Sequence, residues 1–215
     1  MSRRLAIVVL ISGRGSNLQS IIDSITGDTL PADLRAVISN CGDALGLERA
    51  RQAGVSTEVV DHRRFSDRAS FDRALADVID RHGAELVILA GFMRILGAEF
   101  VARYRGRLIN IHPSLLPAFR GLDTHRRALE AGVAEHGASV HFVTEELDGG
   151  PVIVHARVPV LPGDTAEVLA ARVLEQEHRI LPETIRWFAQ GRLALDDHQV
   201  ILDGRPLDAP VDLSL

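Results

Sequence analysis

The sequence predicts an α/β fold in which a single Rossmann-like domain forms a mostly parallel, twisted sheet with helices on both faces. Short, continuously apolar runs alternate with amphipathic helical patterns through the first half of the chain, which is typical of parallel strands covered on both sides. The length of 215 residues allows one domain with a substantial core. A content of 46% hydrophobic and 25% charged residues is that of an ordinary globular protein.

The first half of the chain supplies the regular part of this pattern. The strand-like runs are Leu5–Ile11, Arg35–Ser39, Ser56–Val60, Leu86–Ala90 and Leu108–Ile111. The helical patterns between them are Leu18–Thr26, Ala44–Ala53, Asp67–Arg81 and Ala98–Tyr104. Within the third of these helices, Phe71, Leu75 and Val78 recur at the helical period with charges opposite, which predicts a surface helix packed on the sheet.

The second half is less regular. Its further strands are expected at Val140–Val143 and Val152–Val160. A long helix is expected to begin at Asp164, where Glu167 supports a capping interaction. Pro182 should divide this helix into two or kink it. The chain then predicts a small hairpin over Leu193–Leu202 and a loosely held tail over residues 203–215.

Charge and residue usage exclude several functions. A net charge of −5 offers no basic surface for nucleic acid, and no apolar run approaches the roughly 20 residues that span a membrane. The single Cys41 excludes an internal disulfide framework and suits the cytoplasm. All 24 basic residues are arginine, so a Walker-type phosphate loop, a Schiff base and pyridoxal-phosphate attachment are excluded. No cluster of His, Asp or Glu has the spacing of metal ligands.

A glycine-rich loop follows the first predicted strand. In Ser12-Gly13-Arg14-Gly15-Ser16-Asn17, the glycines allow close backbone approach, and the following helix start favours an anion. The alternative is a plain strand–helix turn capped by Ser16 or Asn17. A dinucleotide is disfavoured, because Leu18 occupies the third glycine position and the next strand ends without an acidic residue. The loop therefore favours a phosphomonoester.

Asn110, His112 and Asp148 carry groups suited to acyl transfer without a covalent intermediate. Asn110 and His112 are two apart, so they project from the same side of an extended segment, which Pro113 ends. Asn110 can donate to a developing oxyanion, His112 can transfer a proton, and Asp148 can hold the imidazolium. Taken alone, each of the three residues has a structural alternative. Asn110 could stabilise a turn by bonding to local backbone, His112 could be a structural histidine bonded to backbone, and Asp148 could be a turn residue before two glycines. His141 is expected to be structural, whereas His125 lies where it could touch a ligand.

Four segments carry a resemblance over nearly the full chain, from about Ala6 to Leu193. They read SGRGSNL from Ser12, AGFMRIL from Ala90, NIHPSLLP from Asn110 and LDGGP from Leu147. In order and spacing, they closely resemble the folate-dependent glycinamide ribonucleotide formyltransferases. This resemblance implies formyl transfer from 10-formyltetrahydrofolate, as co-substrate and without a metal, to the amine of a ribonucleotide.

The resemblance also implies a role for particular residues. Asn110, His112 and Asp148 would be catalytic. The ribonucleotide phosphate would be held by Gly15, Ser16 and Asn17, and its ribose by Glu177. Folate would be bound by Met93, Arg94, Ile95, Leu96 and Asn110, with Arg68 near its tail. Some relatives have glutamine near the phosphate where this chain has Leu174, a loss that Arg14 could offset. A mobile loop would correspond to about residues 114–135.

The single domain of residues 1–215 would thus have two functional halves. Residues 1–105 would bind the phosphate and nucleotide, and residues 106–200 would serve catalysis and folate binding. Its partners would be small molecules, with no nucleic acid or membrane, and the protein would be a monomer or homodimer. Formyltetrahydrofolate hydrolases usually have an N-terminal regulatory domain, which disfavours that reading. Methionyl-tRNA formyltransferases should have an additional C-terminal nucleic-acid domain and more basic character, so they are disfavoured too. A non-catalytic binding module would be preferred only if the catalytic trio were broken.

Overall fold

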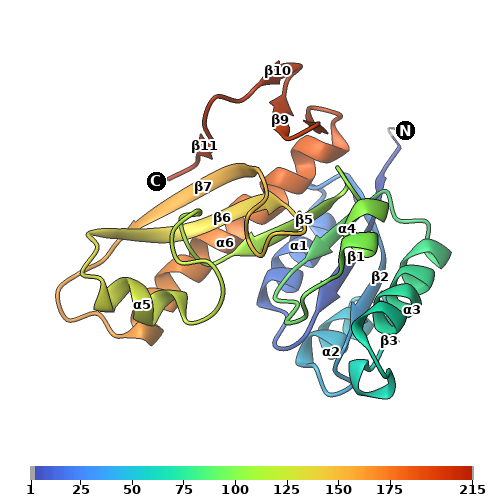
Figure 1. Ribbon diagram of the computed structural model, residues 1–215. Coiled ribbons are helices and arrows are strands. Elements are labelled where there is room, and N and C mark those ends of the chain that lie inside the picture. The colour runs from blue at the N-terminus through green and yellow to red at the C-terminus, as the bar shows by residue number, and fades with distance from the viewer. Residues whose placement is uncertain (1–2, 215) are drawn as a thin grey trace. The chain divides into compact units, whose positions relative to one another are not determined.

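The computed structural model describes residues 3–214 of the chain. The chain forms two compact units, and the boundary between them lies between Asn110 and Ile111. In Figure 1 the first unit runs from blue to green and the second from yellow-green to red. No helix in the described part of the chain is long and apolar enough to span a membrane.

The first unit is built on parallel strands. These are β1 (Leu5–Ile11), β2 (Ala32–Ser39), β3 (Ser56–Val59), β4 (Leu86–Leu89) and β5 (Leu108–His112). They lie side by side in the order β3-β2-β1-β4-β5, and each neighbouring pair is parallel. Residues 7–11 of β1 are completely buried. The continuous apolar runs of the sequence are thus explained by strands covered on both faces.

Helices cover these strands on both sides. They are α1 (Ser16–Thr26), α2 (Leu45–Gln52), α3 (Arg68–Arg81) and α4 (Ala98–Arg103), with a short 3₁₀ turn, η1, at His62–Arg64. Because crossovers between parallel strands are right-handed, α1 and α2 lie on one face, and α3 and α4 on the other after the strand order reverses. In agreement, α1 contacts α2 and α3 contacts α4 (Figure 1).

The reversal of strand order occurs between β1 and β4. The loops that follow these two neighbouring strands, 12–15 and 90–97, leave the same edge of the sheet because the strands are parallel. Asn110, which is paired with Leu89 of β4, lies toward the same edge near the end of β5. Such an edge is where open α/β sheets bind ligands.

The second unit combines an antiparallel pair with one long helix. Strands β6 (Glu135–Phe142) and β7 (Val152–Pro159) are antiparallel, and α6 (Ala166–Ala189) packs on both. A short helix, α5 (Thr124–Glu130), contacts α6. It lies within the segment 114–135 that the sequence presents as a loop. The expected hairpin is formed by β8 (Leu193–Asp196) and β9 (Gln199–Leu202), which β10 (Arg205–Pro206) extends.

The structure contradicts the predicted cap of α6 and one of the two alternatives for Pro182, the division into two helices. The cap is Thr165, whose side chain accepts from the backbone N–H of Val168, whereas Asp164 accepts from Arg172 at 2.7 and 2.9 Å. Pro182 does not divide the helix, which continues for 24 residues. Pro182 cannot donate a backbone hydrogen bond. The buried residues on either side of it, including Ile180 and Ile185, hold the helix in place through packing.

The expectation of a loosely held tail is also wrong. Strand β11 (Val211–Asp212) pairs in parallel with β7, and the N–H of Leu213 donates to the carbonyl of His155. Arg157 of β7 donates through Nε to Asp212 at 2.9 Å, and its backbone N–H donates to Ser214 Oγ. Residues 211–214 of the tail are therefore fixed by contacts that are distant in sequence, and Leu215 lies outside the described residues.

Candidate active site

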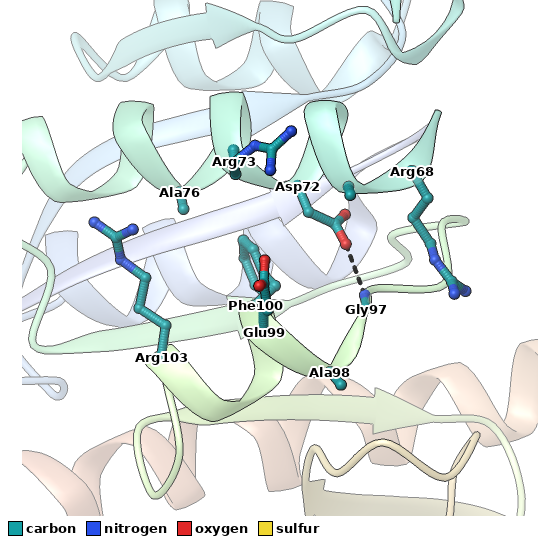
Figure 2. Close-up of a pocket in the computed structure, with 10 residues that line it drawn as sticks. Arg68, Asp72, Arg73, Ala76, Gly97, Ala98, Glu99, Phe100 and Arg103 are labelled. Atoms are coloured by element: carbon teal, nitrogen blue, oxygen red, sulfur yellow. Dashed lines mark hydrogen bonds between the residues drawn. The ribbon is translucent and has the colours of Figure 1, made fainter. Parts of the chain in front are cut away.

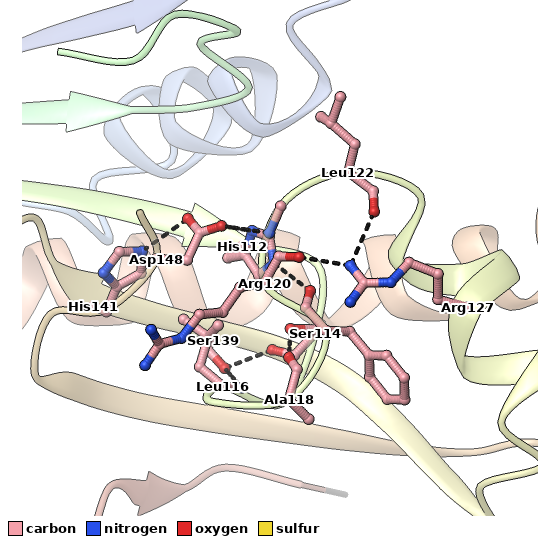
Figure 3. A network of polar contacts seen from close by, with 12 residues as sticks. His112, Ser114, Leu116, Ala118, Arg120, Leu122, Arg127, Ser139, His141 and Asp148 are labelled. Atoms are coloured by element: carbon pink, nitrogen blue, oxygen red, sulfur yellow. Dashed lines mark hydrogen bonds and ion pairs between the residues drawn. The ribbon is translucent and has the colours of Figure 1, made fainter. Parts of the chain in front are cut away.

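His112 and Asp148 lie together in the second unit. His112 ends β5, because Pro113 cannot continue the strand, and its side chain is buried. Its Nδ1 lies 3.5 Å from Oδ2 of Asp148, and both side chains are more than nine-tenths buried. The carboxylate of the Asp-Gly-Gly turn thus folds back onto the histidine of the Asn-x-His segment (Figure 3).

The turn that presents Asp148 depends on its glycines. Asp148 itself has a φ of 48°, in the left-handed region that few residues other than glycine, asparagine and aspartate adopt readily. A Cβ atom on Gly150 would lie 1.8 Å from the carbonyl oxygen of Phe142, and one on Gly149 would meet the side chain of Glu146. A side chain is therefore excluded at Gly150, which lets the turn pack against β6, whereas one at Gly149 would have to displace the flexible side chain of Glu146.

Asp148 has two further neighbours that the sequence did not reveal. The backbone N–H of Gly121 donates to Oδ2 at 2.8 Å, and Nε2 of His141 lies 3.8 Å from Oδ1. Gly121 has a φ of 79°, which a glycine adopts without strain. His141 is buried in β6, whose residues 136–142 are all buried. Nothing in the sequence pattern indicates that it lies beside Asp148.

The second nitrogen of His112 is also occupied. Nε2 lies 3.1 Å from the carbonyl oxygen of Phe119. A carbonyl can only accept a hydrogen bond, so Nε2 of His112 carries a hydrogen. Nδ1 faces Asp148 with a lone pair in the neutral ring and with a second N–H in the imidazolium. Protonation of Nδ1 would therefore place an imidazolium between a carbonyl and a carboxylate. Phe119 was not identifiable from sequence because the contact uses its backbone.

Buried serines fix the segment that carries Phe119. Ser114 Oγ donates to the carbonyl of Ala118 at 2.6 Å, and Ser139 Oγ donates to the carbonyl of Ser114 at 2.6 Å. Ser139 Oγ also accepts from the N–H of Leu116, which precedes a cis peptide bond to Pro117. Figure 3 shows these contacts on one side of the His112–Asp148 pair. They order the first part of the segment 114–135.

Two other histidines of this unit are held in the neutral form. Burial lowers the pKa of His141 to about 4, although its Nδ1 donates to the carbonyl of Phe142 at 2.9 Å. Burial, reinforced by His125 and His112, lowers the pKa of His136 to about 4. His125 packs edge-to-face on His136, with 5.2 Å between the ring centroids. Of the two imidazoles beside Asp148, His141 is thus neutral near pH 7.

These buried histidines predict a loss of stability in mild acid. Between pH 6.5 and about 4, the unfolded chain binds protons at His136 and His141 that the folded chain does not. The stability that depends on the two neutral histidines should therefore be fully present above pH 6.5. The free energy of unfolding should then fall as the pH decreases, by roughly 1–3 kcal/mol for each group. Urea unfolding at pH 7.5, 6.0 and 5.0 measures this. His136→Gln should flatten the dependence, and the exposed His198→Gln should leave it unchanged; an equal slope in the two variants would contradict the assignment.

The glycine loop at the end of β1 leaves the start of α1 without a side-chain cap. Gly15 is the N-cap residue, with a φ of 70°, and no side-chain hydrogen bond caps the helix. The alternative of a turn capped by Ser16 or Asn17 is thus wrong. A Cβ on Gly15 would lie 2.6 Å from Cα of Gly46, so the loop packs closely on the start of α2. The first-turn N–H groups of α1 suit an anion.

The segment Met93–Leu96 lies in the neighbouring loop after β4. It has no regular secondary structure, and Met93 and Ile95 expose about 60% of their side-chain surface, whereas Leu96 is buried. Asn110 is half-buried on β5, two residues before His112. On a strand this spacing places the two side chains on the same side, as the sequence predicts.

Arg68 opens α3 and lines a pocket between α3 and α4. The pocket has a volume of about 270 Å³, and Figure 2 shows Arg68 at one end and Arg103 at the other. Gly97, which directly follows Leu96, lines it as well. Arg68 is therefore close in the fold to the segment 93–96.

Glu177 and Leu174 both lie on α6. Glu177 is buried beside the fully buried Val173, as their spacing predicts, and Leu174 is half-buried. Among residues 3–214, no group of three His, Cys, Asp or Glu side chains is placed to hold a metal ion.

Comparison with known proteins identifies the family. Residues 5–185 match the model of the formyl transferase family. A phosphoribosylglycinamide formyltransferase of Escherichia coli strain K12 is 56% identical over 201 residues, which cover 94% of this chain and 95% of that protein. The solved phosphoribosylglycinamide formyltransferase of Coxiella burnetii, in complex with CHES, has a TM-score of 0.94 and 52% identity, covering 97% of this chain and 99% of that one.

A second solved structure agrees. Glycinamide ribonucleotide transformylase 1 of Symbiobacterium toebii has a TM-score of 0.91 and 48% identity, covering 94% of this chain and 95% of that one. The predicted fold class, with its central, mostly parallel sheet flanked by helices, is confirmed by these matches, and so are the predicted resemblance and the prediction of an enzyme. The chain belongs to the formyl transferase family.

Proposed function

We propose that this enzyme transfers the formyl group of 10-formyltetrahydrofolate to the amino group of N1-(5-phospho-D-ribosyl)glycinamide. The product is formylglycinamide ribonucleotide, an intermediate of de novo purine (IMP) biosynthesis. The observation that carries the proposal is the buried pair of His112 Nδ1 and Asp148 Oδ2, 3.5 Å apart. Its support is the high identity to proteins named for this activity.

The two substrates are assigned to two loops of the first unit. The phosphate of the acceptor is held by the backbone of Gly15, Ser16 and Asn17 at the uncapped start of α1. The folate is bound along Met93–Leu96, where Met93 and Ile95 are exposed on a stretch without regular secondary structure. Arg68 lies near the folate tail, and Glu177 binds the ribose hydroxyls.

The reaction begins when the neutral amine attacks the formyl carbon. The carbonyl oxygen becomes an oxyanion, which accepts a hydrogen bond from the side-chain amide of Asn110. Imidazolium at His112 stabilises the same charge and gives a proton to the departing folate nitrogen, and the proton that the attacking amine loses restores the imidazolium. The Asp148 carboxylate holds the positive charge on the ring, and His141, neutral near pH 7, does not compete for that role.

His112 must expose Nε2 to reach the substrates. This atom donates to the carbonyl of Phe119, so that carbonyl has to leave it before proton transfer. The predicted motion of the segment 114–135 supplies such a displacement only if the hydrogen bond from Ser114 to Ala118, which holds Phe119 in place, opens as well. The segment then closes over the ligands and excludes water.

An absorbance assay tests the activity. The purified enzyme is mixed with 10-formyltetrahydrofolate, with and without the ribonucleotide, and release of tetrahydrofolate is followed. Release that requires the amine supports the transferase. Release at an equal rate without the amine would establish a formyltetrahydrofolate hydrolase instead, and no release in either mixture would reject both.

A further inference from the structure

The segment Met93–Leu96 is held at both of its ends by side chains from other elements. The backbone N–H of Met93 donates to Ser12 Oγ at 2.7 Å, and the backbone N–H of Gly97 donates to Asp72 Oδ2 at 2.7 Å. Phe92 and Leu96 are buried at the same two ends. Between these anchors the backbone lacks regular structure. The conformation of the segment therefore depends on two side chains, Ser12 and Asp72.

Ser12 is itself fixed in one orientation. Its hydroxyl donates to Oδ1 of the buried Asn40 at 2.5 Å, so its oxygen is left to accept from Met93. Nδ1 of His62 packs against the other end of Asn40, 3.1 Å from Nδ2 and 3.2 Å from the backbone carbonyl oxygen. A hydroxyl has a single hydrogen to donate, and the hydrogen of Ser12 is used in the bond to Asn40. This chain of contacts specifies where the N–H of Met93 must lie.

Ser12 also belongs to the glycine loop that carries Gly15, Ser16 and Asn17. Its backbone N–H donates to the carbonyl of Gly91 at 3.0 Å, which adds a second bond between the loops after β1 and β4. These loops meet where the strand order reverses. The Ser12 hydroxyl thus connects the acceptor loop with the donor segment.

Asp72 is a buried carboxylate rather than a surface charge of α3. Its side chain is 6% exposed, and the pKa of the carboxyl is raised by burial against the opposing effects of the Gly97 N–H and Arg68. Burying a charge costs free energy unless it is hydrogen-bonded, and the N–H of Gly97 supplies such a bond to Asp72. Figure 2 shows it pointing at the backbone of Gly97, at the start of α4.

We propose that Ser12 and Asp72 are positioning residues for the formyl donor, which fix the backbone of Met93–Leu96 from both ends. The inference rests on the proposed function, since that function assigns the folate to this segment. Neither side chain needs to touch the reacting atoms. Their loss should weaken the donor site while leaving the chemical step largely intact.

Amide exchange and donor affinity test the two anchors separately. In Ser12→Ala, the amide of Met93 should exchange at least tenfold faster by NMR, and the Kd for 10-formyltetrahydrofolate without acceptor should rise about tenfold. Ser12→Thr keeps the hydroxyl and should restore both values. In Asp72→Ala, the Gly97 amide and the donor Kd should change in the same way, whereas Asp72→Asn keeps an acceptor oxygen and should rescue them.

Two matched variants control for the deletion itself. Ser24→Ala removes a hydroxyl that donates within α1, and Asp77→Ala removes an exposed carboxylate of α3; both should leave exchange and donor Kd unchanged. In steady state, Asp72→Ala should raise the KM for the donor about tenfold and change kcat and the acceptor KM by less than about threefold.

The outcomes separate this inference from the proposed function. Faster exchange at Met93 and Gly97 with an unchanged donor Kd would overturn the inference, and so would unchanged exchange in both alanine variants. If the native enzyme binds the donor but transfers nothing to the ribonucleotide, the proposed function fails. A higher Kd for 10-formyltetrahydrofolate in Ser12→Ala would then still support the positioning role. If the native enzyme binds no donor, both proposals fall.

Discussion

Asp148→Asn is expected to lower kcat by a factor on the order of 10³–10⁴ while leaving the binding of both substrates measurable. In the native enzyme the N–H of Gly121 donates to Oδ2 of Asp148 at 2.8 Å. The amide is isosteric with the carboxylate, so its oxygen can still accept this hydrogen bond. What it loses is the negative charge beside Nδ1 of His112. Without that charge, the imidazolium formed in the reaction is not stabilised.

Single-turnover rates and substrate affinities measure this effect on chemistry and binding separately. Glu146→Gln is the matched control, because Glu146 is a carboxylate of the same turn that pairs with Arg120 and is 65% exposed. Its activity should stay within about threefold of the native enzyme, as expected for a surface ion pair. Turnover near the native rate in Asp148→Asn would remove Asp148 from the catalytic assignment.

The sequence predicts the fold well where local pattern and environment agree. Buried parallel strands need apolar side chains on both faces, so the runs at β1 and β4 were visible as continuous hydrophobic stretches. The stop at His112 was visible because Pro113 removes a backbone donor. The closeness of His112 and Asp148 followed only from their joint occurrence in a resembling family, since no local pattern relates residues 36 positions apart.

The features that were missed depend on tertiary contacts. Pro182 has a strong local tendency to end a helix, but burial of the surrounding turns overrides it. Strand β11 has two residues, and its place is set by β7 and Arg157 rather than by its own sequence. Phe119 reaches His112 through a backbone carbonyl, which every residue has. Sequence patterns carry no signal for such a contact.

His112→Ala is expected to lower kcat by about 10²–10⁴, because it removes the proton donor and the positive charge near the oxyanion. The variant also removes the His112 ring from Asp148, which keeps only the neutral His141 beside it, and it leaves the Phe119 carbonyl without the His112 donor. His198→Ala, which removes an exposed imidazole, should retain native turnover. Rapid-quench measurement of formyl transfer distinguishes a slower chemical step from slower product release.

The double variant decides whether the two residues act as one unit. If the only catalytic role of Asp148 is to stabilise the charged ring of His112, then Asp148→Asn should cost almost nothing once His112 is alanine. The combined loss in kcat should therefore be close to that of His112→Ala alone, far below the product of the two single losses. Losses that multiply would mean that Asp148 acts independently, through Gly121 or directly on a substrate, and that the 3.5 Å pair is not the catalytic unit.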